Sequence, residues 1–294
     1  MPDPSGAADL AGTAGSAEAG SPPDPATVAD LVAARARVLV AIVAACARSG
    51  RDPSGVTLVA VSKTVDAVQL RAALAAGLTT LGENRVQEAE EKVPAVPGGR
   101  WHLIGPLQAN KARRAVAIFD VIESVDSVAL AIRLDRLAGE LRPGRPLPIL
   151  LQVNVDADPA KAGFKPDDLA SALPALVVLP NLHLRGVMTV GRFVTTTEEA
   201  RSTFRALRAL SERLRAPAPP PARFGADAAT ASARGLGPAL SMGMSDDYPV
   251  AIEEGATLVR VGRALFGERP RAHGDGVAHS HARGVAPVPA ADRA

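Results

Sequence analysis

Short apolar segments alternate with helical patterns along most of the chain, and this alternation limits the folds that the sequence can adopt. Between the apolar segments, hydrophobic residues recur at helical spacing, as Val68, Leu70 and Leu74 do before Gly77. This spacing predicts helices at 66–76, 84–92, 108–117, 127–140, from about 166, 197–214 and 248–254. The apolar segments lie at 57–61, 79–82, 101–105, 119–122, 148–155, 182–188, 239–243 and 257–262. Eight strands that alternate with helices predict an α/β protein with a closed (β/α)8 TIM barrel.

The barrel pattern covers only part of the sequence. A helical pattern from Ala26 to about Ser49 precedes the first strand, so the barrel is expected to carry a leading helix. Residues 1–24 and 270–294 lack an apolar face, and we predict that both are disordered tails. Residues 216–237 are rich in Pro, Ala and Gly, which predicts a flexible insertion in a barrel domain at 25–269.

Composition narrows the class of protein. The formal net charge of +2 gives no basic surface for a polyanion, so we expect no nucleic-acid partner. The sequence has neither a signal-peptide pattern nor an apolar run of membrane-spanning length. Its one cysteine, Cys46, fits a reducing compartment, and we expect a cytoplasmic protein. His273, His279 and His281 lack supporting acids or cysteines, so we predict no metal site.

The first predicted strand runs directly into Ser62, Lys63 and Thr64. Lysine is scarce in this chain, with five among 33 basic residues, and the active sites of barrels lie where strands end. Lys63 is therefore either a strand-end lysine that extends into water or an amine that forms a Schiff base. The second role requires a partly buried site, because burial favours a neutral amine.

The last two predicted strands carry residues suited to binding phosphate. Ser241 and Ser245 lie on and after the seventh strand, and Arg260, Gly262 and Arg263 lie on and after the eighth. Barrels commonly bind phosphate on these two loops, where glycine lets backbone N–H groups approach an anion. Taken separately, the segment after the seventh strand could be a loop with an acidic N-cap for the next helix, and Arg260 could be an ordinary charge at a strand end. Together with an amine after the first strand, they indicate a pyridoxal-phosphate site.

Long motifs in this sequence resemble the YggS/PROSC family of pyridoxal-phosphate homeostasis proteins from about residue 25 to 270. The motifs are VSKT at 61–64, GENRVQE at 82–88, WHLIGPLQANK at 101–111, LQVN at 151–154, LRGVM at 184–188, LSMGMSDD at 240–247 and VRVGRALFG at 259–267. The resemblance implies a barrel like the N-terminal domain of alanine racemase. It also implies that Lys63 carries pyridoxal 5'-phosphate as a covalent aldimine.

The resemblance assigns roles to further residues. Arg260 would face the pyridine nitrogen, while Asn84 and His102 would line the edge of the cofactor. Ser245, Gly262 and residue 263 would hold the phosphate. Members of the family usually carry Ser or Thr where this chain has Arg263, so a hydroxyl donor is missing. Arg263 either contacts the phosphate itself or points outward, and the sequence leaves both possibilities open.

Two classes of function are compatible with such a site. A racemase-like enzyme would need a second base such as a tyrosine, and the only tyrosine, Tyr248, follows the phosphate loop. An arginine at 260 also makes a poor proton donor to the pyridine nitrogen. The favoured reading, which the resemblance also implies, is a carrier without robust catalytic activity of its own, and we expect it to be a monomer. It would buffer pyridoxal phosphate or deliver it to apo-enzymes that depend on this cofactor.

Overall fold

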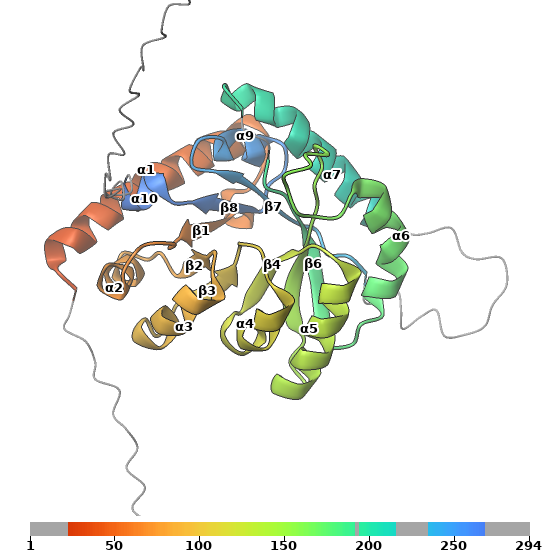
Figure 1. Cartoon of the computed structure of the whole chain (residues 1–294). Coiled ribbons are helices and arrows are strands. Elements are labelled where there is room, and N and C mark those ends of the chain that lie inside the picture. The colour runs from red at the N-terminus through yellow and green to blue at the C-terminus, as the bar shows by residue number, and fades with distance from the viewer. Residues whose placement is uncertain (1–22, 192–193, 216–234, 268–294) are drawn as a thin grey trace, which may run out of the picture.

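Eight parallel strands form a closed barrel in sequence order, which confirms the predicted fold (Figure 1). The computed structural model describes residues 23–191, 194–215 and 235–267. The strands are β1 (Thr57–Val61), β2 (Thr80–Glu83), β3 (Arg100–Leu103), β4 (Val121–Val125), β5 (Leu147–Gln152), β6 (Leu182–Met188), β7 (Ala239–Met244) and β8 (Leu258–Val261). The predicted tails and insertion lie outside the described residues, apart from residues 23–24 and 235–237, and remain predictions.

Helices surround the barrel in the described part of the chain (Figure 1). They are α1 (Pro25–Arg48), α2 (Ala67–Ala75), α3 (Val86–Ala95), α4 (Ala112–Ile118), α5 (Val128–Leu141), α6 (Pro166–Val177), α7 (Arg201–Arg215), α9 (Tyr248–Glu253) and α10 (Arg263–Phe266). Most lie within a few residues of the predicted segments. The helix α3 begins at Val86, two residues after the predicted start, which leaves Asn84 in the loop that precedes it.

The leading helix α1 takes the place of a full-length eighth barrel helix. It packs against α2, α9 and α10, and α10 has only four residues. The Asp24 side chain caps α1 by accepting hydrogen bonds from the Ala26 and Thr27 backbone amides. Leu31, Val38 and the single cysteine, Cys46, are buried on its inner face. The helix therefore covers the place where β8 returns to pair with β1.

The barrel interior contains an apolar cluster and a polar group. Val59, Val121, Leu150, Met188, Ala239 and Leu258 form the cluster, with Ile104 packed against it. Because strand side chains alternate between the two faces, residues two positions away from Ile104, Val121, Ala239 and Leu258 also point inward. These positions include His102, Glu123, Ser241 and Arg260, all of which are buried.

Gly186→Ala is expected to disturb the pairing of β6 with β7. Gly186 has φ +153°, and a Cβ atom there would lie 1.9 Å from the Ala239 carbonyl oxygen. Since the two residues are register partners, neither backbone can move away freely. We expect the free energy of unfolding to fall by about 3 kcal/mol, the upper end of typical overpacking costs. Urea denaturation followed by circular dichroism measures this loss.

Gly144→Ala is the matched control. Gly144 also has a positive φ, +72°, but a Cβ atom there would meet nothing within 4 Å. We expect a loss of about 1 kcal/mol from the left-handed backbone alone. Equal losses for the two variants would show that the close approach of β6 and β7 is unimportant.

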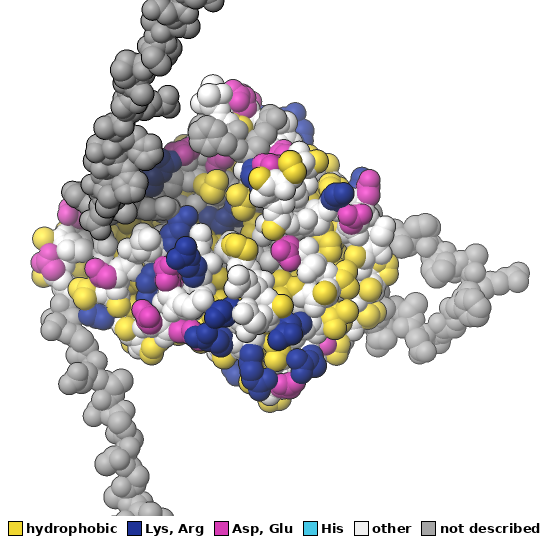
Figure 2. All heavy atoms as spheres, in the orientation of Figure 1, with side chains coloured by type: hydrophobic (Ala, Val, Ile, Leu, Met, Phe, Trp, Pro, Cys, Tyr) yellow, Lys and Arg dark blue, Asp and Glu magenta, His cyan; other side chains and the backbone are white. Residues whose placement is uncertain are grey.

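Charges of both signs are mixed on the visible surface. Figure 2 shows Lys and Arg side chains gathered over α4 and α5, with Asp and Glu side chains among them. Arg113 and Arg136 both pair with Glu140 in this region, and Arg114 pairs with Glu90. Among the described residues, no helix combines the length and apolarity needed to cross a bilayer. His273, His279 and His281 lie outside the described residues.

Candidate functional site

A pocket of about 280 Å³ opens at the end of the barrel where the strands terminate. We call it the Lys63 pocket. Six of the eight predicted site residues line it: Lys63, Asn84, Ser245, Arg260, Gly262 and Arg263. They come from the ends of β1, β2, β7 and β8 and from the loops that follow. Val61, Ile104, Val190 and Met244 supply apolar walls.

Contacts on the outside of the barrel fix the strand end that carries Lys63. The Lys92 ammonium donates to the Ser62 carbonyl oxygen at 3.0 Å and to Glu83 Oε1 at 2.7 Å. The Ser62 hydroxyl donates to the same Glu83 oxygen at 2.8 Å. Burial raises the pKa of Glu83, although Lys92 and Ser62 act against this shift. The ends of β1 and β2 are thereby held together beside the pocket.

The residue after the lysine has an unusual backbone. Thr64 has φ +66°, in the left-handed region that β-branched residues rarely adopt. Its hydroxyl donates to the Lys63 carbonyl oxygen at 2.5 Å. Such strain typically costs about 1–3 kcal/mol and tends to occur where a side chain must be held in one place. The turn at Thr64 ends β1 abruptly and leaves Lys63 at the pocket.

The two predicted phosphate loops meet in the structure. The Gly262 backbone N–H donates to the Ser245 hydroxyl oxygen at 3.1 Å, which joins the loop after β8 to the loop after β7. The Met244 N–H donates to the buried Asp247 carboxylate at 2.6 Å, and this bond orders the second loop. Burial raises the pKa of Asp247, while the Met244 bond and the Arg260 charge oppose the shift. Arg263 pairs with Asp246 at the exposed rim.

A chain of buried hydrogen bonds lies beneath the Lys63 pocket. Arg260 Nη1 donates to the Ser241 hydroxyl at 2.6 Å, and Ser241 donates to Glu123 Oε2 at 2.5 Å. The other Glu123 oxygen lies 2.6 Å from His102 Nδ1. A second Arg260 nitrogen donates to the Thr189 carbonyl oxygen at 2.8 Å. We call His102, Glu123, Ser241 and Arg260 the buried polar chain.

Charge compensation explains how the Glu123 and Arg260 charges are accommodated inside the barrel. Burial disfavours the Glu123 carboxylate, but the His102 and Ser241 hydrogen bonds and the charges of His102 and Arg260 outweigh it. The pKa of Glu123 therefore lies below its ordinary value. Burial lowers the pKa of Arg260, and the charges of Glu123 and Asp247 oppose that shift. Arg260 thus presents a fixed, internally paired guanidinium to the pocket.

His102 and Ser241 do not line the Lys63 pocket. They lie deeper in the barrel, so their contact with a cofactor remains a prediction.

Sequence reasoning did not identify Glu123, which joins them. The only signal for it was a carboxylate in an apolar strand, at a position whose alternation points inward.

Comparisons with known proteins relate the whole barrel to one family. Residues 41–270 match the family model described as the N-terminal domain of alanine racemase. The pyridoxal phosphate homeostasis protein of Pseudomonas aeruginosa is 41% identical over 239 residues, which cover 80% of this chain and 94% of that protein. The protein of the same name from Escherichia coli is 36% identical over 247 residues, which cover 80% and 94%.

Solved structures agree with these sequence matches. PipY of Synechococcus elongatus, determined with PLP bound, is 41% identical and has a TM-score of 0.66, covering 81% of this chain and 100% of PipY. An alanine racemase from Streptomyces lavendulae has a TM-score of 0.55 at 22% identity, covering 83% of this chain and 58% of that enzyme. The second likeness concerns the fold alone.

Proposed function

Because this chain belongs to the family of pyridoxal phosphate homeostasis proteins, we propose that it binds pyridoxal phosphate in the Lys63 pocket and buffers or delivers it. The observation that carries this proposal is the meeting of a lysine amine with the Ser245–Gly262 loop pair in one pocket. The similarity to PipY, whose structure has PLP bound, supports the same ligand.

The chemistry of the pocket suits this cofactor. Pyridoxal phosphate carries an aldehyde that reacts reversibly with amines, and Lys63 supplies the amine. Ser245, Gly262 and the backbone of Arg263 would hold the phosphate, and Arg260 would face the ring nitrogen. Asn84 would line the edge of the ring. The volume of about 280 Å³ is close to the lower limit, about 300 Å³, that is typical of small-molecule sites.

A carrier role is favoured over catalysis by the groups around the pocket. The single tyrosine, Tyr248, is buried in the core and does not line the pocket, so no tyrosine is placed there as a second base. Arg260 stays protonated in its paired surroundings, and an arginine is a poor proton donor to the ring nitrogen. Both features argue against racemase-like chemistry, which needs a proton donor and an electron-withdrawing ring.

Two measurements test this function. The loaded protein should restore activity to an apo-enzyme that depends on pyridoxal phosphate, at a rate faster than unassisted dissociation of the cofactor. Incubation of the loaded protein with L- and D-alanine should produce neither racemisation nor transamination. Turnover that disappears in Lys63→Ala would instead support the racemase-like alternative.

Ser245→Ala is expected to weaken pyridoxal phosphate binding, whereas Arg263→Ala should change it little. Loss of one charge-assisted hydrogen bond costs about 1.5–3 kcal/mol, which is roughly ten- to a hundredfold in affinity. The Arg263 side chain already pairs with Asp246 at the exposed rim, so we expect less than about a threefold effect from it. Titration with pyridoxal phosphate and with unphosphorylated pyridoxal separates contacts to the phosphate from contacts to the ring.

The unphosphorylated ligand is the internal control, because Ser245→Ala should leave its affinity unchanged. Arg263→Thr restores the hydroxyl usual in the family and should tighten binding of the phosphorylated form alone. A tenfold or greater loss in Arg263→Ala that is confined to the phosphorylated ligand would place the guanidinium on the phosphate. It would also contradict the outward orientation.

A further inference from the structure

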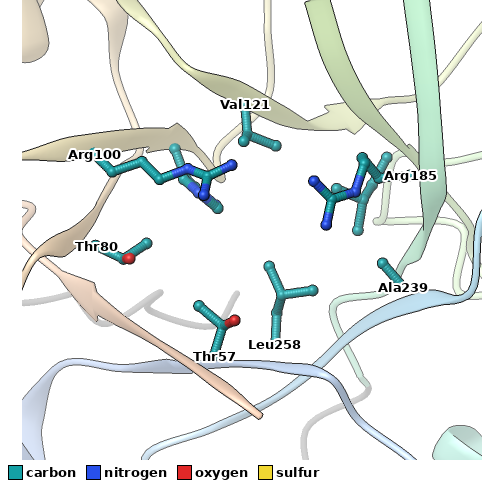
Figure 3. Close-up of a pocket in the computed structure, with 9 residues that line it drawn as sticks. Thr57, Thr80, Arg100, Val121, Arg185, Ala239 and Leu258 are labelled. Carbon is teal, nitrogen blue, oxygen red and sulfur yellow. The ribbon is translucent and has the colours of Figure 1, made fainter. Parts of the chain in front are cut away.

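A second cavity lies at the opposite end of the barrel, where the strands begin. It is lined by residues from all eight strands, so it sits on the barrel axis. Figure 3 shows the Arg100 and Arg185 side chains extending toward one another across this cavity, with Thr57 and Thr80 beside them. We call this cavity the N-terminal chamber. It shares no lining residue with the Lys63 pocket. His102 of the buried polar chain lines the chamber, and Arg260 of the same chain lines the Lys63 pocket.

The two arginines bring positive charge to the chamber, and none of the residues described as lining it is an aspartate or a glutamate. Within the described residues, neither side chain forms an ion pair, whereas Arg201 pairs with three carboxylates. Like charges that face one cavity repel each other, and an anion between them offsets that repulsion. A guanidinium presents several N–H donors in a planar fork that matches carboxylate or phosphate oxygens.

A histidine that lines the chamber supplies a further polar atom, His102 Nε2. His102 lines the chamber and is only 3% exposed. Its Nδ1 faces Glu123, while its Nε2 is buried and has no hydrogen-bond partner among the described residues. Buried polar nitrogens are normally hydrogen-bonded, so an unpartnered one on a residue that lines a cavity indicates a ligand or water there. The Glu123 carboxylate can only accept, so His102 Nδ1 donates to it, and Nε2 is the ring nitrogen left for an occupant of the chamber.

Size and wall chemistry restrict the ligand. The cavity volume is about 60 Å³, and residues such as Val121 and Leu150 make the remaining walls apolar. We propose that the N-terminal chamber binds a small oxyanion, a carboxylate or a phosphate-type ion, between Arg100 and Arg185 and above His102. The threonine hydroxyls of β1 and β2 offer additional donors at the rim. The chamber shares no lining residue with the Lys63 pocket, so its anion binding can be measured whether or not pyridoxal phosphate is bound there.

Calorimetric titration of the full chain tests the proposal, with sulfate, inorganic phosphate and acetate as probes. We expect one equivalent to bind in the chamber, distinct from binding at the Ser245–Gly262 loops, and Arg100→Gln and Arg185→Gln each to weaken it by about ten- to a hundredfold. Both arginines are exposed, so these variants should fold normally. Comparison of the three probes shows whether tetrahedral or planar oxyanions are preferred.

Two control variants locate the site. Arg113→Gln removes a surface arginine that pairs with Glu140 and should leave the affinity unchanged. Ser245→Ala changes the Lys63 pocket and should also leave it unchanged, so binding there is distinguished from binding in the chamber. A crystal soaked in selenate should show an anomalous peak between Arg100 and Arg185. The proposal is overturned if sulfate affinity is insensitive to both chamber variants, or if Ser245→Ala abolishes it.

Discussion

Lys63→Ala is expected to abolish covalent attachment of pyridoxal phosphate while leaving weaker binding in place. The amine lies at the end of β1, whereas Ser245 and Gly262 belong to loops after β7 and β8 and keep their own hydrogen bond. After borohydride reduction, the intact mass of the wild-type protein should rise by one cofactor, and that of Lys63→Ala should not rise. Equilibrium dialysis should still detect reversible binding of pyridoxal phosphate to the variant.

Lys111→Ala is the matched control for the loss of an amine. Lys111 lines a neighbouring surface pocket that shares Asn84 with the Lys63 pocket. It is the nearest alternative that the sequence suggests, since it follows the third strand in the QANK segment. We expect this variant to retain a reducible cofactor at the wild-type level. If Lys63→Ala retained the reduced adduct and Lys111→Ala lost it, the attachment site would have to be reassigned.

Glu123→Ala is expected to produce the largest loss of stability among single substitutions in the barrel interior. The carboxylate joins His102 to Ser241 and offsets the charge of the buried Arg260. Removing one partner of a buried charged pair typically costs about 3–5 kcal/mol, because the other charge is left uncompensated. Urea denaturation should show a loss of that size. Glu140→Ala, at an exposed pair with Arg113 and Arg136, should cost less than about 1 kcal/mol.

The pH dependence of this loss provides a second check. Because the folded protein holds the pKa of Glu123 below its ordinary value, ionisation of Glu123 stabilises the fold at pH values above the unfolded pKa, about 4.3. That contribution disappears as the pH falls through the lower, folded pKa. The stability difference between wild type and Glu123→Ala should therefore be constant near neutral pH and shrink in acid. A difference that grew in acid would contradict the direction of the shift.

The fold could be read from the sequence because its signal is local and repeated. Each strand and helix carries its own apolar pattern, and β1 and β6 have the predicted bounds. One difference from the predicted helices lies at the end of the barrel that holds the Lys63 pocket. Asn84 was expected to begin a helix, but it lies in the loop that lines the Lys63 pocket, and α3 starts at Val86.

The site was only partly predictable because depth inside a barrel is not a local property. Ser241 and Ser245 lie on one short segment, yet only Ser245 reaches the pocket, while Ser241 lies one layer lower. Glu123 contacts Ser241 across 118 residues of sequence, and no motif links the two positions. Such contacts follow from barrel closure and strand register, which a single sequence shows only indirectly.

The buried polar chain also joins the two ends of the barrel through hydrogen bonds. His102 borders the N-terminal chamber, Arg260 borders the Lys63 pocket, and Glu123 is bonded toward both. An anion that fixes the imidazole would alter the field that Arg260 experiences. By reciprocity, the factor by which sulfate changes the affinity for pyridoxal phosphate must equal the factor by which pyridoxal phosphate changes the affinity for sulfate. If this factor differs from one, the two sites are coupled through the barrel interior. The anion concentration in solution would then change the affinity for pyridoxal phosphate.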